Sequence, residues 1–178
     1  MGSEPWLTNH GDFDRLFIGG DSAGANIAHN IAMRAGIETL PGGIKIEGAL
    51  LNHPYFWGSE PIGSEPITGR EQGLGCWLWK FVYPSSQGGI DDPMINPFAP
   101  KAPSLARLGC RRLLVCVAGQ DILRDRDIAY CDAVRESGWK GDVELFEADG
   151  KGHVFHIHEP ENDEAKNMFN CLASFILK

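Results

Sequence analysis

The chain has 178 residues, of which 43% are hydrophobic and 22% are charged, a balance typical of one globular domain with a sizeable core. Its formal net charge of −8, without any basic run, argues against nucleic acid or an anionic membrane surface as a partner. No apolar stretch approaches the ~20 residues that a membrane span requires, and the N-terminus lacks the apolar segment of a signal peptide.

The first strongly patterned segment follows a polar stretch, residues 1–15, which is typical of a loop or a short helix. Residues 16–18 (LFI) form a short apolar run that predicts a buried strand. A helical pattern begins shortly afterwards, and residues 20–24 (GDSAG) between the two have the form G-x-S-x-G. The residues expected on the buried face of this helix are Ile27, Ala28, Ile31 and Ala32.

The G-x-S-x-G form is typical of a serine that a tight strand-to-helix turn projects from the top of a sheet. Glycines at positions 20 and 24 are expected to leave room for the backbone to fold back on itself. The helix behind Ser22 would direct its free N–H groups and positive dipole end at developing negative charge. We therefore predict that Ser22 is a nucleophile. The alternative is a glycine turn with Ser22 as an ordinary helix N-cap.

The middle of the chain predicts one further strand and a long insertion. Residues 44–51 (IKIEGALL) are typical of an interior parallel strand, which ends at residues 52–58 (NHPYFWG). We expect a lid or binding-loop insertion at about 55–108, because long irregular segments between core strands are often functional. Within it, residues 58–72 predict a mobile surface loop, and residues 84–108 contain no obvious regular element. A helix is predicted between these loops, with Trp77, Leu78, Phe81 and Val82 on its apolar side.

Two more strands and two more helices are predicted in the last third of the chain. The strands are residues 111–119 (RRLLVCVAG) and 143–148 (VELFEA), and the helices are about 125–137 and 161–177. Strands that alternate with helices imply an α/β protein with a parallel sheet covered by helices on both faces. The last helix carries apolar residues at helical spacing: Ala165, Met168, Phe169, Leu172, Phe175 and Ile176.

The five cysteines show no C-x-x-C spacing, so neither a metal site nor a redox pair is predicted from them. Cys116 lies in a strand-like run and Cys171 in a helical pattern, where thiols usually act as small core residues. We therefore expect a reduced, cytoplasmic protein that uses no metal and no cofactor.

Three reactive residues are predicted to meet at one edge of the sheet, because the carboxyl ends of parallel strands lie together. Ser22 follows the first strand, Asp121 the third and His153 the fourth. This chain order, Ser then Asp then His, is that of α/β-hydrolases. His153 can take the proton of the serine hydroxyl near neutral pH, and Asp121 can fix the imidazole tautomer and stabilise its cation.

Other acidic and histidine residues compete for these roles. Asp125 and Asp127 lie close to Asp121 but fall where a helix begins, so we expect them to cap it. His156 and His158 lie beyond the loop that directly follows the fourth strand. His53 also follows a strand end, but the proline and aromatic residues after it suggest a packed wall.

The segments GDSAGANIAHN, NHPYFWG, AGQDILRD and GHVFHI, with the closing ASFI, resemble the plant carboxylesterases of the hormone-sensitive-lipase-like branch of α/β-hydrolases. The resemblance covers nearly the whole chain. It implies the α/β-hydrolase fold, in which the four predicted strands form a parallel sheet in sequence order. It also implies Ser22 as nucleophile, Asp121 as acid and His153 as base. It also implies that the backbone N–H of Ala23 is one oxyanion donor. The implied activity is hydrolysis of small acylated metabolites through an acyl-enzyme intermediate.

The same resemblance implies two alternatives, a 2-hydroxyisoflavanone dehydratase-like enzyme and a non-catalytic small-ligand protein like the gibberellin receptors. His153 favours an enzyme, because the receptors lack that histidine. The family also has an HGG(G) oxyanion loop and several strands upstream of the nucleophile, and neither is found here. The chain thus resembles the C-terminal portion of a family member with its N-terminal strands missing. We expect weak or no turnover from these residues alone, since losing an oxyanion donor typically costs ~10²–10³ in kcat. The natural ester and the oligomeric state stay open.

Overall fold

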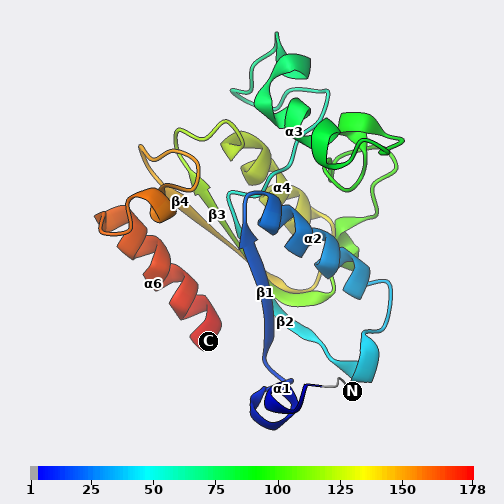
Figure 1. Cartoon of the computed structure of the whole chain (residues 1–178), viewed down its shortest axis with the longest axis vertical. Coiled ribbons are helices and arrows are strands. Elements are labelled where there is room, and N and C mark those ends of the chain that lie inside the picture. The colour runs from blue at the N-terminus through cyan, green and yellow to red at the C-terminus, as the bar shows by residue number, and fades with distance from the viewer. Residues whose placement is uncertain (1–3) are drawn as a thin grey trace.

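The computed structural model describes residues 4–178 and is organised around a parallel sheet of four strands in the order β1-β2-β3-β4 (Figure 1). The predicted sheet, parallel and in sequence order, is confirmed. The predicted second strand begins two residues late, at Ile46, because a 3₁₀ turn, η1 (Pro41–Gly43), precedes it. The strands are β1 (Leu16–Asp21), β2 (Ile46–Asn52), β3 (Cys110–Ala118) and β4 (Asp142–Ala148).

The register of the strands places their carboxyl ends at one edge of the sheet. Asp21 at the end of β1 pairs with Asn52 at the end of β2, and Asn52 pairs with Cys116 in β3. On the other edge of β3, its last residue, Ala118, pairs with Ala148 at the end of β4. The residues that follow these four strands therefore meet at the same edge.

Helices cover both faces of the sheet, as predicted (Figure 1). Helices α2 (Ala23–Ala35) and α4 (Arg124–Glu136) pack on one face, and α6 (Asp163–Leu177) packs on the other. Successive side chains of a strand point to opposite faces, and this alternation divides the interior strands between two apolar clusters. The α2 and α4 cluster contains Ala49, Leu51, Leu113 and Val115, while the α6 cluster contains Leu50, Leu114 and Cys116.

The buried face of α2 differs from the predicted one. Ile27 and Ile31 are 60% and 45% exposed, whereas Ala28 and Ala32 are buried as expected. The other buried residues of the helix are Ala25, Asn26, His29 and Met33. Alanines at this spacing also follow the helical period, and their small side chains allow the helix to lie close to β1 and β2.

The segment between β2 and β3 contains one α-helix, α3 (Leu74–Val82), and three short 3₁₀ turns. The expected buried side of α3 is wrong, because Phe81 and Val82 are 70% and 58% exposed. Trp79 lies in the apolar cluster instead, and a Cβ at Gly75 would approach the Trp57 ring to 3.1 Å. Since α3 is apolar almost all round, its periodicity could not identify the buried side. The 3₁₀ turns are η2 (Arg70–Gln72), η3 (Gly89–Asp91) and η4 (Leu105–Arg107).

Part of the segment expected to be a mobile surface loop is buried. Glu65 and Arg70 are only 4% and 6% exposed, because each is held by charged partners that the local sequence does not reveal. The remaining helices are α1 (Pro5–His10) and the single turn α5 (Phe155–His158). No helix within residues 4–178 combines the length and the apolar character needed to cross a bilayer.

Candidate functional site

Ser22 occupies the turn between β1 and α2 in a strained backbone conformation. Its φ of 54° and ψ of −113° lie in a region that a non-glycine residue rarely adopts. The turn is held from both sides: the Ser22 N–H donates to the Asn52 carbonyl (2.8 Å), and the Ser22 carbonyl accepts from the Tyr55 N–H (3.0 Å). The Ser22 side chain makes no capping hydrogen bond to α2, so the reading of Ser22 as an ordinary N-cap is wrong.

The two glycines of the motif do not have the same steric role. A Cβ on Gly20 would lie 2.5 Å from the Gly24 carbonyl carbon, so only glycine fits at position 20. A Cβ on Gly24 would meet no heavy atom within 4 Å among the described residues. The tight turn therefore requires a residue without a side chain at position 20, because the backbone of Gly24 packs directly against Gly20.

Ser22, His153 and Asp121 form a continuous hydrogen-bonded chain. His153 Nε2 lies 2.9 Å from Ser22 Oγ, and His153 Nδ1 lies 2.5 Å from Asp121 Oδ2. The three residues follow β1, β4 and β3, and the common carboxyl edge of the sheet brings them together. The arrangement can move a proton from the hydroxyl to the imidazole while the carboxylate stabilises the resulting cation.

The Asp121 carboxyl group is buried yet held as an anion. Burial by itself would raise its pKa, but the hydrogen bonds from His153 and the backbone N–H of Leu123, together with the nearby His53 imidazole, outweigh burial and hold the pKa of Asp121 well below its usual range. The Leu123 N–H donates to Oδ1 at 3.1 Å, which leaves Oδ2 facing the imidazoles. Asp121 is therefore negatively charged at neutral pH.

The competing histidine, His156, belongs to a different contact. Its Nε2 lies 2.9 Å from Asp21 Oδ1, an oxygen that also accepts a hydrogen bond from Asn52. Burial lowers the pKa of His156, and the nearby Asp21 opposes that effect. His158 lies further on, at the end of the α5 turn. His153 is thus the histidine that contacts Ser22.

The expectation that Asp125 and Asp127 cap α4 is wrong. The N-cap position is Leu123, and it makes no side-chain capping bond. Asp125 Oδ2 accepts from the Ser64 N–H at 2.6 Å, so this side chain holds the 58–72 segment instead. Asp127 lies inside the first turn, where burial raises its pKa well above the ordinary value. The two residues stand two and four positions past Leu123, inside the helix rather than at its cap.

Sequence reasoning assigned His53 to a packed wall and missed its position beside Asp121. The side chain is fully buried, and its Nδ1 lies 3.5 Å from Asp121 Oδ2. Its ring is stacked on that of His156, with centroids 5.5 Å apart. The signal that could have identified it is its place immediately after β2, at the edge where the other site residues gather.

Ligand atoms of His53, Asp121 and His153 lie within 4.8 Å of one another, as the ligands of a metal can. The 2.5 Å separation between Asp121 and His153 is a hydrogen-bond distance that leaves no room for an ion between the two atoms. We therefore interpret the group as hydrogen-bonded side chains rather than as a metal site.

An apolar hollow of about 170 Å³ opens beside Ser22. One wall comes from α3, which is fixed in place because the Tyr55 hydroxyl donates to the Gly75 carbonyl. The opposite wall comes from the loop that carries Asp121. Ala23, the first residue of α2, has no intrahelical acceptor for its N–H. Besides Ser22, Asp121 and His153, the hollow is lined by Tyr55, Leu74, Gly75, Leu78, Ile122 and Leu123.

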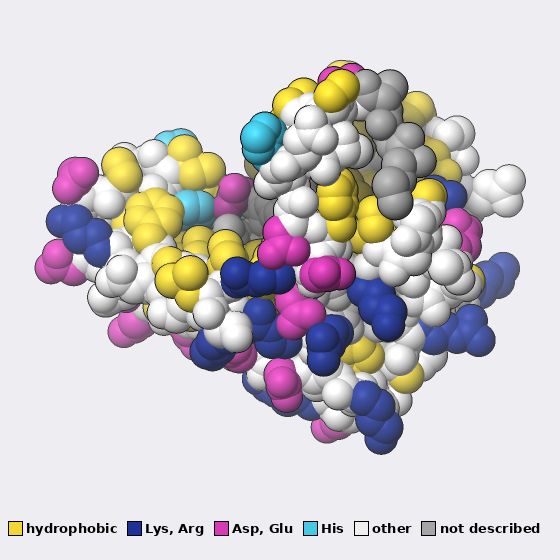
Figure 2. All heavy atoms as spheres, turned by 90° about the horizontal axis from the view of Figure 1, so that it is seen from below, with side chains coloured by type: hydrophobic (Ala, Val, Ile, Leu, Met, Phe, Trp, Pro, Cys, Tyr) yellow, Lys and Arg dark blue, Asp and Glu magenta, His cyan; other side chains and the backbone are white. Residues whose placement is uncertain are grey.

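Elsewhere the surface mixes charges of both signs. On the face that Figure 2 shows, Lys and Arg side chains lie among Asp and Glu side chains. Ion pairs of this kind include Arg111 with Glu47 (3.3 Å) and Lys178 with Glu144 (2.7 Å).

A family model described as "alpha/beta hydrolase fold" matches residues 2–157 of the chain. The chain is 55% identical over 175 residues to a 2-hydroxyisoflavanone dehydratase from Glycyrrhiza echinata, covering 98% of the chain and 53% of that protein. It is 49% identical to probable carboxylesterase 2 from Arabidopsis thaliana, covering 98% of the chain and 54% of that protein. The chain therefore spans about half the length of these curated relatives.

Among solved structures, the fold is similar to that of the esterase LipW from Mycobacterium marinum. The TM-score is 0.73 at 22% sequence identity, and the match covers 96% of this chain and 53% of LipW. An esterase from the archaeon Pyrobaculum calidifontis gives a TM-score of 0.68 at 21% identity, with 96% and 56% covered. At these identities the likeness concerns the fold alone.

Proposed function

Since the chain belongs to the α/β-hydrolase family, we propose that it carries the catalytic triad of a carboxylic ester hydrolase. Ser22 is the nucleophile, His153 the general base and Asp121 the acid that orients it. The observation that carries this proposal is the hydrogen-bonded chain from Ser22 Oγ through His153 to Asp121 Oδ2, at 2.9 Å and 2.5 Å. The strained turn at Ser22 supports it, because strain of this kind is typical of a nucleophile held at a strand-to-helix turn.

The reaction follows from these contacts. As Ser22 Oγ bonds to the carbonyl carbon of the ester, its proton passes to His153 Nε2, and Asp121 stabilises the imidazolium. The oxyanion forms near the N-terminus of α2, where the Ala23 N–H donates to it. His153 then returns the proton to the leaving alcohol, and an acyl group stays on Ser22. Water, activated by His153 in the same way, releases the acid and restores the serine.

The substrate class we propose is a small acylated metabolite. The apolar lining of the hollow beside Ser22 suits an uncharged acyl or aromatic group. Because the chain spans about half the length of its curated relatives, the activity is proposed for the native-length protein. Ala23 supplies one oxyanion donor.

A 2-hydroxyisoflavanone dehydratase-like reaction is the second candidate. The observation that favours it is identity, at 55% and 53%, to dehydratases from Glycyrrhiza echinata and Glycine max. A non-catalytic receptor is less well supported, because His153 stands within hydrogen-bond distance of both Ser22 and Asp121. Assaying one preparation with a p-nitrophenyl ester and with a 2-hydroxyisoflavanone separates the two enzymatic candidates.

The proposal extends to the cellular setting and the partners. A reducing, cytoplasmic environment is supported by five cysteines that are all unpaired. A small-molecule ester, rather than nucleic acid or a membrane, is the partner that the net charge of −8 supports. We also propose that the 55–108 segment acts as the lid or binding-loop insertion of this single domain, since α3 borders the hollow.

The test is covalent labelling of the native-length protein with a fluorophosphonate probe, followed by peptide mass spectrometry. An activated hydroxyl attacks phosphorus as it attacks a carbonyl, so the probe should modify Ser22 and labelling should disappear in Ser22→Ala. Labelling that persists unchanged in Ser22→Ala would overturn the assignment. Hydrolysis of a short p-nitrophenyl ester should be lost in parallel.

A further inference from the structure

We propose that His53 is a positioning residue that orients the Asp121 carboxylate toward His153 and moderates the negative charge that His153 experiences. The inference rests on the proposed function, because it assigns His53 a part in the same reaction. His53 does not touch the substrate or Ser22 in this role, and it acts through Asp121. Three observations support it: its burial, the direction of its ring and the identity of its neighbours.

The burial of His53 requires an explanation. Its exposed fraction is 0%, and neither ring nitrogen has a hydrogen-bond partner among the described residues. A buried imidazole without partners loses the hydrogen bonds that water would supply, a cost that an apolar side chain of similar volume would avoid. A residue that only filled this space could be leucine.

The direction of the ring supplies that explanation. His53 Nδ1 lies 3.5 Å from Asp121 Oδ2, the same oxygen that lies 2.5 Å from His153 Nδ1. Hydrogen bonds around a catalytic carboxylate are often long before the substrate binds and shorten afterwards. With its hydrogen on Nδ1, His53 directs a donor at the oxygen that faces His153, which opposes rotation of the carboxylate.

Packing holds the His53 ring in that direction. It is stacked on His156, with centroids 5.5 Å apart and planes 9° apart, and its edge meets Phe155 at 5.9 Å. The backbone of His53 has a φ of 48°, and its N–H donates to the Cys116 carbonyl at 2.7 Å. Both the main chain and the ring are therefore constrained.

The charged and titratable groups around this pair determine the direction of the expected effect. They are Asp121 after β3, His153 after β4, His156 in α5, Asp21 at the end of β1 and Asp127 in α4. Asp21 is paired with His156, and burial raises the pKa of Asp127, which favours its neutral form. Asp121 is the carboxylate in direct contact with the His53 ring, at 3.5 Å. A donor on Asp121 weakens its attraction for a proton on His153. Removing that donor should make His153 easier to protonate.

The test is the pH dependence of fluorophosphonate labelling at Ser22 in three variants of the native-length protein. His53→Leu fills the space without a donor. His53→Asn places an amide nitrogen where Nδ1 was, and asparagine tolerates a positive φ. His29→Asn is the matched control, because His29 is likewise a buried imidazole, but its hydrogen-bond partner is the Tyr130 hydroxyl rather than Asp121.

We expect the pH midpoint of labelling to rise by about half to one unit in His53→Leu, the size expected for one lost hydrogen bond, with a lower plateau. The midpoint should return toward that of the parent in His53→Asn and stay unchanged in His29→Asn. Equal midpoints in the parent and in His53→Leu would overturn the inference, as would equal shifts in His53→Leu and His53→Asn.

A second measurement keeps this test separate from the test of the proposed function. The imidazole resonances of His153 can be titrated by NMR without any reaction at Ser22, and the same upward shift is expected in His53→Leu. If the parent protein is not labelled at Ser22, the proposed function fails while the NMR titration still decides on His53. If His53→Leu does not fold, comparison of the parent with His53→Asn and with His53→Gln, whose amide reaches past the Nδ1 position, replaces it. Equal midpoints in those three proteins would then contradict the inference.

Discussion

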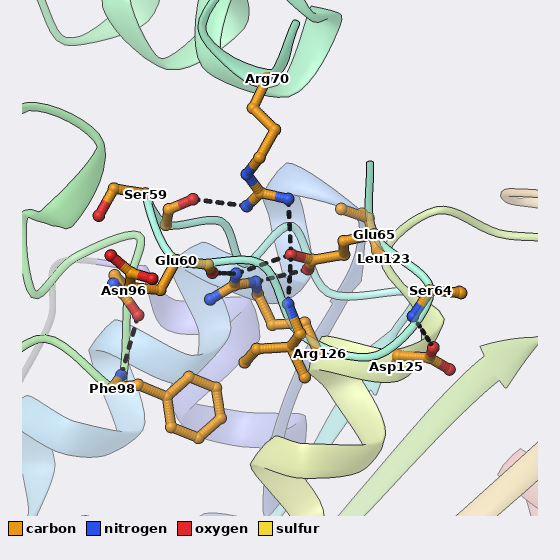
Figure 3. Close-up of polar contacts among 12 residues, drawn as sticks. Ser59, Glu60, Ser64, Glu65, Arg70, Asn96, Phe98, Leu123, Asp125 and Arg126 are labelled. Atoms are coloured by element: carbon orange, nitrogen blue, oxygen red, sulfur yellow. Dashed lines mark hydrogen bonds and ion pairs between the residues drawn. The ribbon is translucent and has the colours of Figure 1, made fainter. Parts of the chain in front are cut away.

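Two buried carboxylates of this protein, Asp121 and Glu65, differ in the type of basic side chain that surrounds them. Asp121 is 8% exposed and faces the imidazoles of His153 and His53. Glu65 is 4% exposed and accepts hydrogen bonds from Arg126 at 2.7 and 2.9 Å and from Arg70 at 2.8 Å (Figure 3). Imidazole gains and loses protons near neutral pH, whereas guanidinium stays charged. Asp121 can therefore support proton transfer by stabilising a protonated imidazole, whereas Glu65 can only hold segments together.

What Glu65 holds is the 58–72 segment. Arg126, from α4, also donates to the Glu60 carbonyl at 2.6 Å, and Arg70 donates to the Gly58 carbonyl at 2.6 Å (Figure 3). The Arg70 guanidinium lies 4.4 Å from the centre of the Trp57 ring, beneath α3. The Glu65 cluster (Glu65, Arg70 and Arg126) thus ties the segment that leads into α3, and with it one wall of the hollow beside Ser22, to the helix that follows Asp121.

The largest effect is expected at the Asp121 network. His153→Ala should reduce hydrolysis of a short p-nitrophenyl ester by the native-length protein by about three orders of magnitude or more, as removal of a triad member does. His156→Ala is the matched control and should change the chemical step far less, since His156 contacts Asp21. Steady-state kinetics on both variants checks this. Similar losses in the two would mean that the wrong histidine has been assigned.

At the Glu65 cluster the expected loss is in stability. Glu65→Ala leaves two buried guanidiniums without their carboxylate, which should lower the free energy of unfolding by about 3–5 kcal/mol. Urea denaturation followed by circular dichroism measures it. The triple variant Glu65→Leu, Arg70→Met, Arg126→Met removes all the buried charges and should recover much of the loss. A cost below about 1 kcal/mol for Glu65→Ala would show that the cluster is not a clamp.

A third buried site shows what burial does to an imidazole that has no carboxylate. Among the described residues, the hydrogen-bond partner of the His29 side chain is the Tyr130 hydroxyl, at 2.9 Å. Burial lowers the pKa of His29 to about 4. Below pH 6.5, His29 binds a proton in the unfolded state but not in the folded state, so the free energy of unfolding falls as the pH drops from 6.5 to 4. The loss should reach about 3 kcal/mol.

Urea denaturation of the parent and of His29→Gln at several pH values between 7 and 4 tests this. The difference in unfolding free energy between them should shrink as the pH falls, because glutamine does not titrate. Parallel curves would mean that His29 is protonated as readily in the folded state as in the unfolded one.

The smallest effect is expected at an exposed pair of the same chemical type as the Glu65 cluster. Arg34 Nε lies 2.8 Å from Glu38 Oε2, but the side chains are 75% and 57% exposed. Solvent screens such a pair, so Glu38→Ala should change the free energy of unfolding by about 0.5 kcal/mol or less. Raising the salt concentration should remove this small difference in the free energy of unfolding. A loss comparable to that of Glu65→Ala would contradict the view that burial makes the difference.

The sequence by itself determined the four strands and the helices between them, because strand and helix periodicities are local properties of the chain. The order of the strands in the sheet came from the resemblance to the α/β-hydrolases. It also identified Ser22, Asp121 and His153 as residues that should meet. Each of them directly follows a strand, and the carboxyl ends of parallel strands share one edge. The structure places these three within hydrogen-bond distance.

Only the tertiary structure decided which side chains those segments bury and which partners they find. Trp79 rather than Phe81 of α3 is buried, because packing against Trp57 selects one side of a helix that is apolar all round. Glu65 finds Arg126 at a separation of 61 positions, and His53 finds Asp121 beyond the end of a neighbouring strand. Such long-range pairs leave no periodic trace in the sequence, since their geometry exists only after the sheet has brought distant segments together.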